Sequence, residues 1–163
     1  DYRGIASEMI FLSNILLARS LQKKYNFKFS PFCKLDQGSF NPVSNIVTAN
    51  PLSKYFVEIL LHEIGHLRCD RSVSRGYFLT WKGEGMTYCG GACYLRRLYQ
   101  EATASKFARR AGRTSIDVQF LLEAFNTYCG SGFEYLCKIG EDGPDRVVYT
   151  DHVVKCINKI RGG

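Results

Sequence analysis

The chain has 163 residues, the length of one domain with one hydrophobic core, and we place that domain over residues 1–163. A core of this size needs no disulfide staple. Apolar residues make up 45% and charged residues 23%, which is ordinary for a globular protein. The net charge of +7 fits an acidic partner such as nucleic acid, an anionic surface or an acidic peptide, but it supports such a partner only weakly.

The cysteines bear on the compartment. Their number, seven, is odd and argues against a fully paired disulfide framework. No signal peptide is visible, and no apolar run approaches the length that spans a bilayer. We therefore predict no membrane span and reduced cysteines in a cytoplasmic protein. The chain begins at Asp1 and not at Met, which is compatible with an excised or processed domain.

The N-terminal segment, residues 4–24, has apolar residues at the spacing of an amphipathic helix. We expect one side of this helix to be buried. The residues expected on that side are Ile5, Met9, Leu12, Leu16 and Leu21.

Two short strands are predicted next. Residues 27–35 alternate like a strand that Pro31 would confine to an edge or a bulge. The stretch "DQGS", residues 36–39, is typical of a turn, and "SNIVTA", residues 44–49, has the pattern of a second strand.

Helices dominate the rest of the chain. Ser53 is the expected N-cap of a helix over about 54–69, and residues 70–90 are Gly-rich and irregular. Thr114 or Ser115 is the expected cap of a later helix. The helices predicted after residue 90 cover about 92–111, 116–128, 132–139 and 151–161. The predicted fold class is α+β, with a small sheet packed on helix 54–69.

That helix carries "HEIGH", residues 62–66, which fits the pattern H-E-x-x-H. His62 and His66 lie one turn apart on one face, so both imidazoles can reach one Zn²⁺ ion. Glu63 is rotated by about 100° and can act as a general base without ligating. Gly65 leaves room for another backbone. The alternative is a pair of histidines satisfied by hydrogen bonds, which the apolar flanks of the motif disfavour.

A catalytic zinc usually has three protein ligands. Glu101 is the favoured third ligand, because small residues share its helical face and allow close packing on another helix. Those residues are Ala104, Ser105 and Ala108. The alternative is an exposed glutamate beside small packing residues. Other candidates for the ligand are Cys69, Asp70, Glu84, Cys89, Cys93 and His152.

H-E-x-x-H followed by "EATASKFA" resembles the glutamate-ligand zincins, whose third ligand begins a helix that often reads E-x-x-A-D-x-F-A. The layout is closest to the ImmA/IrrE-type peptidases, which place a short strand before the H-E-x-G-H helix and the Glu helix. The resemblance implies a zincin-like peptidase fold, with His62, His66 and Glu101 holding one zinc ion and Glu63 as the base.

The resemblance covers about residues 38–110, and the helical part over 111–163 matches no pattern. Ser105 stands where the family commonly has Asp, which can support a metal ligand through a hydrogen bond. Loss of such a supporting group weakens metal sites. The departure puts metal affinity or rate in doubt more than the fold.

Zincins commonly bind a peptide along an edge strand. Ile46, Val47 and Thr48 are the candidate edge, with an ordinary inner strand as the alternative. The transition-state donor is left open. The candidates for it are Tyr77, Tyr88, Tyr94 and His152.

Two further features have ordinary alternatives. "CGGAC", Cys89 to Cys93, is either half of a second metal site or a pair of ordinary thiols, and the second reading is favoured. A basic cluster along and after the Glu101 helix is either a solvated face or a contact for nucleic acid or an acidic substrate, without the interleaved aromatics of a single-strand platform. The cluster comprises Arg96, Arg97, Arg109, Arg110 and Arg113.

The sequence thus predicts a zinc-dependent endopeptidase that cuts a specific protein substrate. The resemblance implies a regulator, such as a repressor, in a bacterial, phage or mobile-element setting. The alternative is a catalytically weak or inactive zincin-fold module that binds a partner or builds a larger viral or mobile-element assembly. The oligomeric state is left open.

Overall fold

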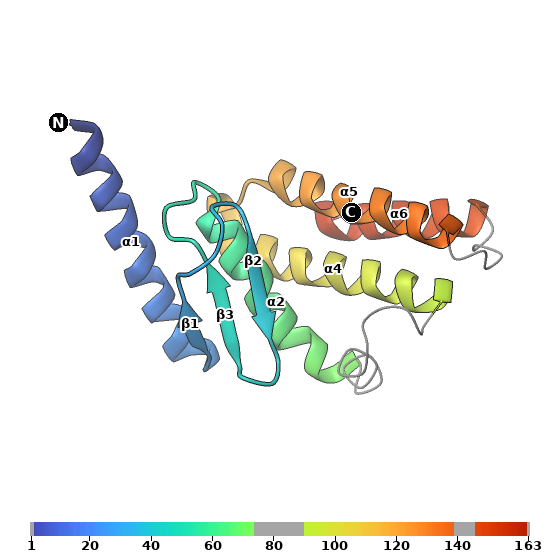
Figure 1. Ribbon diagram of the computed structural model, residues 1–163, viewed down its shortest axis with the longest axis horizontal. Coiled ribbons are helices and arrows are strands. Elements are labelled where there is room, and N and C mark those ends of the chain that lie inside the picture. Colours follow the sequence, from blue (N-terminus) through green and yellow to red (C-terminus); the bar gives the residue numbers. More distant parts are fainter. Residues whose placement is uncertain (1, 74–89, 139–145, 163) are drawn as a thin grey trace.

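The computed structural model describes residues 2–73, 90–138 and 146–162. Its elements are α1 (Tyr2–Tyr25), β1 (Lys28–Ser30), β2 (Gly38–Asn41), β3 (Ile46–Ala49), α2 (Phe56–Val73), α4 (Gly90–Gly112), the 3₁₀ helix η2 (Arg113–Ser115), α5 (Val118–Lys138) and α6 (Arg146–Arg161). The fold is α+β, as predicted. The sheet lies beside α1 and α2, and α4, α5 and α6 run side by side at the other end of the molecule (Figure 1).

The sheet has the order β1-β3-β2, with β1 parallel and β2 antiparallel to β3. β3 is therefore the central strand, and the prediction that Ile46, Val47 and Thr48 form an edge is wrong. The outer strands of the described sheet are β1 and β2, and the start of β2 falls within the predicted turn over residues 36–39. Polar and glycine residues favour a turn there, and pairing with β3 overrides that local preference.

The burial predicted for α1 is also wrong for four of its five apolar positions. Leu21 packs against the core, but Ile5, Met9, Leu12 and Leu16 are all exposed. The helix docks instead through the opposite face, where Ala18 is fully buried and the Asn14 amide donates to the Pro51 carbonyl at 2.7 Å. Apolar residues occur on both sides of α1, so their spacing could not choose the buried face.

Residues Gly4–Tyr25 of α1 are long and apolar enough to cross a membrane, by length and composition. This finding corrects the prediction that no apolar run approaches spanning length. A core helix or a signal sequence near an N-terminus satisfies the same criteria. In the described fold, the N-terminal end of α1 projects away from the rest of the molecule (Figure 1).

α2 is the central core helix. Phe56, Leu60, Ile64 and Leu67 form its buried stripe, as their helical spacing predicts. The Ser53 hydroxyl accepts a hydrogen bond from the Tyr55 amide at 3.1 Å, which satisfies an amide at the N-terminal end of this helix. The stripe packs on the sheet and on α4, so the orientation of α2 is fixed from both sides.

The C-terminal helices differ from prediction in their boundaries. α5 is one helix to Lys138, so residues 132–138 of the separate helix predicted at 132–139 are its final part, and α6 begins before residue 151. Asp117, and not Thr114 or Ser115, caps α5, because its carboxylate accepts from the Phe120 amide at 3.2 Å. The buried Glu58 carboxylate of α2 accepts from the Asp117 amide at 2.9 Å and ties α5 to α2.

Candidate metal centre

Two helices bring three ligand side chains to one point. His62 and His66 lie one turn apart on α2, and Glu101 reaches them from α4. The Glu101 Oε2 atom lies 2.9 Å from His62 Nε2 and 3.2 Å from His66 Nε2. The two Nε2 atoms are 3.1 Å apart. These are the three residues that the sequence predicts as metal ligands.

Gly65 permits this convergence. A Cβ atom at Gly65 would lie 2.7 Å from the Ala104 carbonyl oxygen and 2.8 Å from its Cα atom. The backbones of α2 and α4 therefore touch between the histidines and the glutamate. Ala104 and Ala108 are fully buried on the same side of α4. The small residues on the Glu101 face thus allow the close packing that their spacing predicts.

The separations fit a tetrahedral metal. Ligand atoms at 2.0–2.1 Å from a zinc ion lie about 3.3–3.4 Å apart along the edges of a tetrahedron. The observed separations of 2.9, 3.1 and 3.2 Å are close to those edges. Imidazole and carboxylate are also the ligand types that zinc takes in catalytic sites. The residues present therefore fit a zinc ion with three protein ligands.

The electrostatics of the cluster call for a cation. Burial raises the pKa of the Glu101 carboxyl. The charge of His66 and hydrogen bonds from His62 and His66 lower this pKa by more, so the net result is a pKa well below its usual range. Glu101 is only 7% exposed, so its anionic carboxylate needs a positive partner. A proton on an imidazole or a metal ion can each supply that charge.

Ser105 orients one of the histidines. Its hydroxyl lies 2.9 Å from His62 Nδ1, and the residue is 3% exposed. In the tautomer with hydrogen on Nδ1, His62 donates to Ser105 and directs the Nε2 lone pair at the cluster. Ser105 thus provides the supporting contact that the family resemblance assigns to an aspartate.

A cleft of about 640 Å³ opens beside the cluster. Its lining includes His62, Glu63 and Glu101, together with Gly38 at the start of β2. A Cβ atom at Gly38 would lie 3.3 Å from the Glu63 side chain, so β2 passes directly against the predicted base. The opposite wall belongs to α5, and its residues are Phe120, Leu121, Glu123, Ala124, Phe125, Thr127 and Tyr128.

Other predicted site residues are not brought to this cluster. His152 lies on α6 with its ring 6.4 Å from that of Tyr99, and it does not line the cleft. Cys69 lies on α2 but is not part of the ligand cluster. Several candidates fall outside what the structure describes, in position or in side chain. These are Asp70, Tyr77, Glu84, Tyr88, Cys89, Cys93, Tyr94 and Arg96.

Sequence reasoning missed Tyr128, whose side chain lines the cleft and whose ring lies 5.7 Å from the Arg97 guanidinium carbon. Leu121, Phe125 and Tyr128 recur at helical spacing along α5, and that period could have indicated one face turned toward a neighbour. The spacing alone does not indicate that this face of α5 lines the cleft.

Comparisons with protein-family models, with curated proteins and with solved structures found no match to this chain. The chemistry of the site is therefore inferred from its residues and their geometry.

Proposed function

We propose that the protein is a zinc-dependent endopeptidase. The observation that carries the proposal is the convergence of His62, His66 and Glu101 to within 3.2 Å at the side of a cleft that also holds Glu63. The resemblance of the two motifs to the ImmA/IrrE-type peptidases supports the same assignment. Three ligands leave a fourth position of the metal open for water, as catalytic zinc sites require.

A bound zinc ion would polarise a scissile carbonyl and lower the pKa of a water molecule. Two residues of the chain have further roles in the proposed reaction. Glu63 accepts the proton of the attacking water and passes it to the leaving amine. Ser105 keeps the His62 tautomer that directs Nε2 at the metal.

We propose β2 as the strand that holds the substrate. It is an edge of the sheet that the described residues form, and it begins at Gly38 on the rim of the cleft. An extended peptide can pair with such an edge through main-chain hydrogen bonds, with alternate side chains entering pockets. The aromatic residues Phe120, Phe125 and Tyr128 on the facing wall favour an apolar side chain near the scissile bond. A specific protein, such as a regulator, is the proposed substrate class.

Glu63→Gln tests the proposal, with a proteome-derived peptide library as the probe. We expect the zinc-loaded protein to create new peptide termini, detected by mass spectrometry, and the variant to create none while it still binds zinc. The matched control is Glu8→Gln, because Glu8 is exposed on α1 and does not line the cleft. It should cleave like the unmutated protein.

Two results would contradict the proposal. Cleavage by the Glu63→Gln variant at the unmutated rate would remove Glu63 from the reaction. Zinc binding without cleavage of any peptide or candidate protein substrate would favour the alternative, a zincin-like module that binds a partner.

A further inference from the structure

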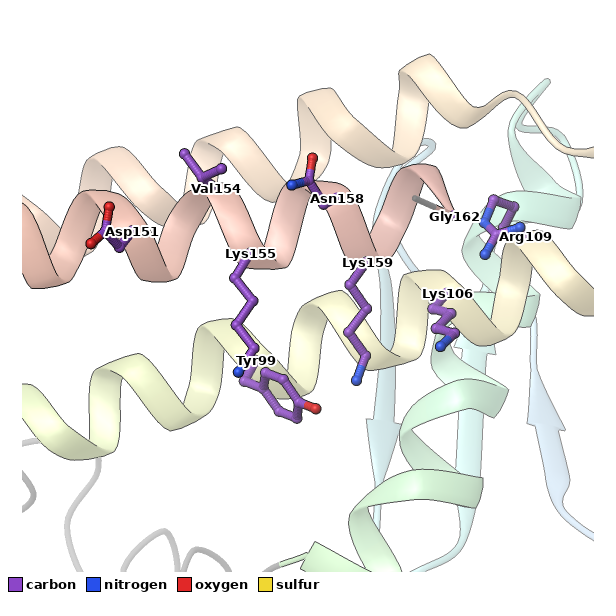
Figure 2. Close-up of a pocket in the computed structure, with 9 residues that line it drawn as sticks. All are labelled: Tyr99, Lys106, Arg109, Asp151, Val154, Lys155, Asn158, Lys159 and Gly162. Atoms are coloured by element: carbon purple, nitrogen blue, oxygen red, sulfur yellow. The ribbon is translucent and has the colours of Figure 1, made fainter.

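A second cavity, of about 520 Å³, lies between α4 and α6, and four cationic side chains line it. Figure 2 shows Lys155 and Lys159 reaching from α6 toward Tyr99 on α4, with Lys106 and Arg109 further along α4. The other residues that line this basic groove are Asp151, Val154, Asn158 and Gly162. A groove with four cations and one acid has a strong positive potential.

The lysines of the basic groove form no ion pair with an acidic side chain among the described residues. Among the described residues, the ion pairs of the metal cluster join Glu101 to the two histidines and involve no lysine of the groove. Lys106, Lys155 and Lys159 therefore have no acidic partner among these residues. Arg109 is anchored, because its Nε–H group donates to the Ile160 carbonyl at 2.8 Å.

Tyr99 lies among these cations. The Lys159 ammonium is 4.0 Å from the centre of the Tyr99 ring, and the Lys155 ammonium is 5.9 Å away. The hydrogen bond and charge of Lys159, with a smaller contribution from Lys155, lower the pKa of Tyr99. Since Lys159 covers a face of the ring, that face is closed to a stacked base.

We propose that the basic groove binds the phosphodiester backbone of a nucleic acid through its phosphates, without reading bases. Lysine, arginine, asparagine and tyrosine are typical phosphate-contacting side chains. Tyr99 and Arg109 are ten residues apart on α4, roughly 15 Å along the helix, so the groove can contact several successive phosphates.

The walls of the groove favour this ligand over an acidic peptide. Both walls are helices, whose main-chain groups are already paired within each helix. An extended peptide would therefore find no strand edge to pair with. A nucleic-acid backbone needs only cationic and polar side chains. The face of Tyr99 that Lys159 covers cannot serve as the stacking platform that single-strand binders use for bases, so the proposed contacts are to phosphates.

The groove differs from the arginine cluster considered in the sequence. Arg97 packs over Tyr128 at the metal cleft, whereas Arg109 turns to α6. Of the cluster members whose side chains the structure describes, Arg109 alone lines the groove, where lysines of α6 complete the positive surface. Tyr99 and Lys106 lie on the side of α4 away from Glu101, so this proposal does not depend on zinc or on peptidase activity.

Fluorescence anisotropy with a labelled single-stranded oligothymidine tests the proposal across a series of salt concentrations. Three or four phosphate contacts predict a slope of log K against log salt of about −2 to −3. Lys155→Ala/Lys159→Ala should weaken binding at least about tenfold and make the slope less steep by about 1.4. Lys155→Arg/Lys159→Arg, which keeps both charges, should retain binding.

The matched control is Lys23→Ala/Lys28→Ala. These lysines are exposed on α1 and β1, and their removal changes the net charge equally. The control should leave the slope unchanged. Should the Lys155/Lys159 alanine variant fail to fold, Lys106→Ala carries the same test, with a slope smaller by about 0.7.

Two outcomes would overturn the proposal. Equal loss of binding in both double variants would show a diffuse effect of net charge and not a site. Tighter binding of poly-glutamate than of the oligonucleotide, lost in the Lys155/Lys159 variant, would assign the groove to an acidic peptide.

Discussion

The Nδ1 atom of His62 lies 2.9 Å from the hydroxyl oxygen of Ser105, one turn after Glu101 on the same helix. α4 therefore supplies both a candidate ligand and the group that orients a second ligand on α2. Because both helices are packed in the core, the cluster is held by rigid elements and not by loops.

Ser105→Ala should weaken zinc binding by about 10- to 100-fold, because His62 loses the acceptor that fixes its tautomer. Ser105→Asp should bind zinc at least as tightly as the unmutated protein. Competition with a chromophoric chelator measures both affinities. Thr103→Ala is the control, since Thr103 donates to the Tyr99 carbonyl on the same helix and does not contact the cluster. An unchanged affinity in Ser105→Ala would contradict this role.

Gly65→Ala should destabilise the protein by about 1–3 kcal/mol, because the added methyl group would meet the Ala104 backbone and separate α2 from α4. Zinc binding should weaken with it, since the histidines move away from Glu101. Chemical denaturation measures the first effect. Gly4→Ala is the control, because a Cβ atom at Gly4 meets no atom within 4 Å. Equal stability of Gly65→Ala and the unmutated protein would contradict the close packing.

The ligand cluster could be predicted because its signals are local. The spacing of His62 and His66 on one helix, and of Glu101 with small residues on another, defines the two faces that meet. The core stripe of α2 follows from the same period. The α+β class follows from two strand patterns among several helices.

Features that depend on tertiary pairing could not be predicted in the same way. β3 has the pattern of a strand at either position in a sheet, and only pairing with β2 makes it central. Apolar residues on both sides of α1 left its buried face undecided, and the polar Asn14 helps to fix it. The basic groove brings Lys106 of α4 together with Lys155 and Lys159 of α6. These residues are far apart in the sequence, so no local pattern predicts that they line one cavity.

Glu58→Ala should cost about 1–3 kcal/mol of unfolding free energy, because it leaves the Asp117 amide at the start of α5 without its acceptor. Glu58→Gln keeps a carbonyl acceptor and should cost clearly less. Urea denaturation of the two variants gives the comparison. If both variants lose the same stability, the hydrogen bond to Asp117 is not what Glu58 contributes.

The buried thiols of α5 and α6 predict a loss of stability in alkali. Burial raises the pKa of Cys129 to about 11, with a further contribution from Cys156, and burial raises the pKa of Cys156 to about 11. The unfolded chain releases these protons near pH 9, before the folded protein does. Stability should therefore be full below about pH 9 and fall as the pH rises toward 11.

Denaturation at several pH values measures this loss. In Cys156→Ala the decline should be smaller, because one of the shifted thiols is absent. Cys33→Ala is the comparison: burial and the charge of Glu63 also raise the pKa of Cys33, but this thiol is only partly buried, so its removal should change the decline less than Cys156→Ala does. A decline in Cys156→Ala as steep as that of the unmutated protein would exclude the Cys156 thiol as its source.

The zinc content of the chain tests the central claim most directly. The full chain is offered zinc, desalted and analysed for metal, together with His62→Ala, Glu101→Gln and the control His152→Ala, with circular dichroism to check folding. We expect one zinc ion per chain in the unmutated protein and in His152→Ala, and none in the folded His62 and Glu101 variants. Absence of zinc from the unmutated protein, or full retention by Glu101→Gln, would contradict the three-ligand site.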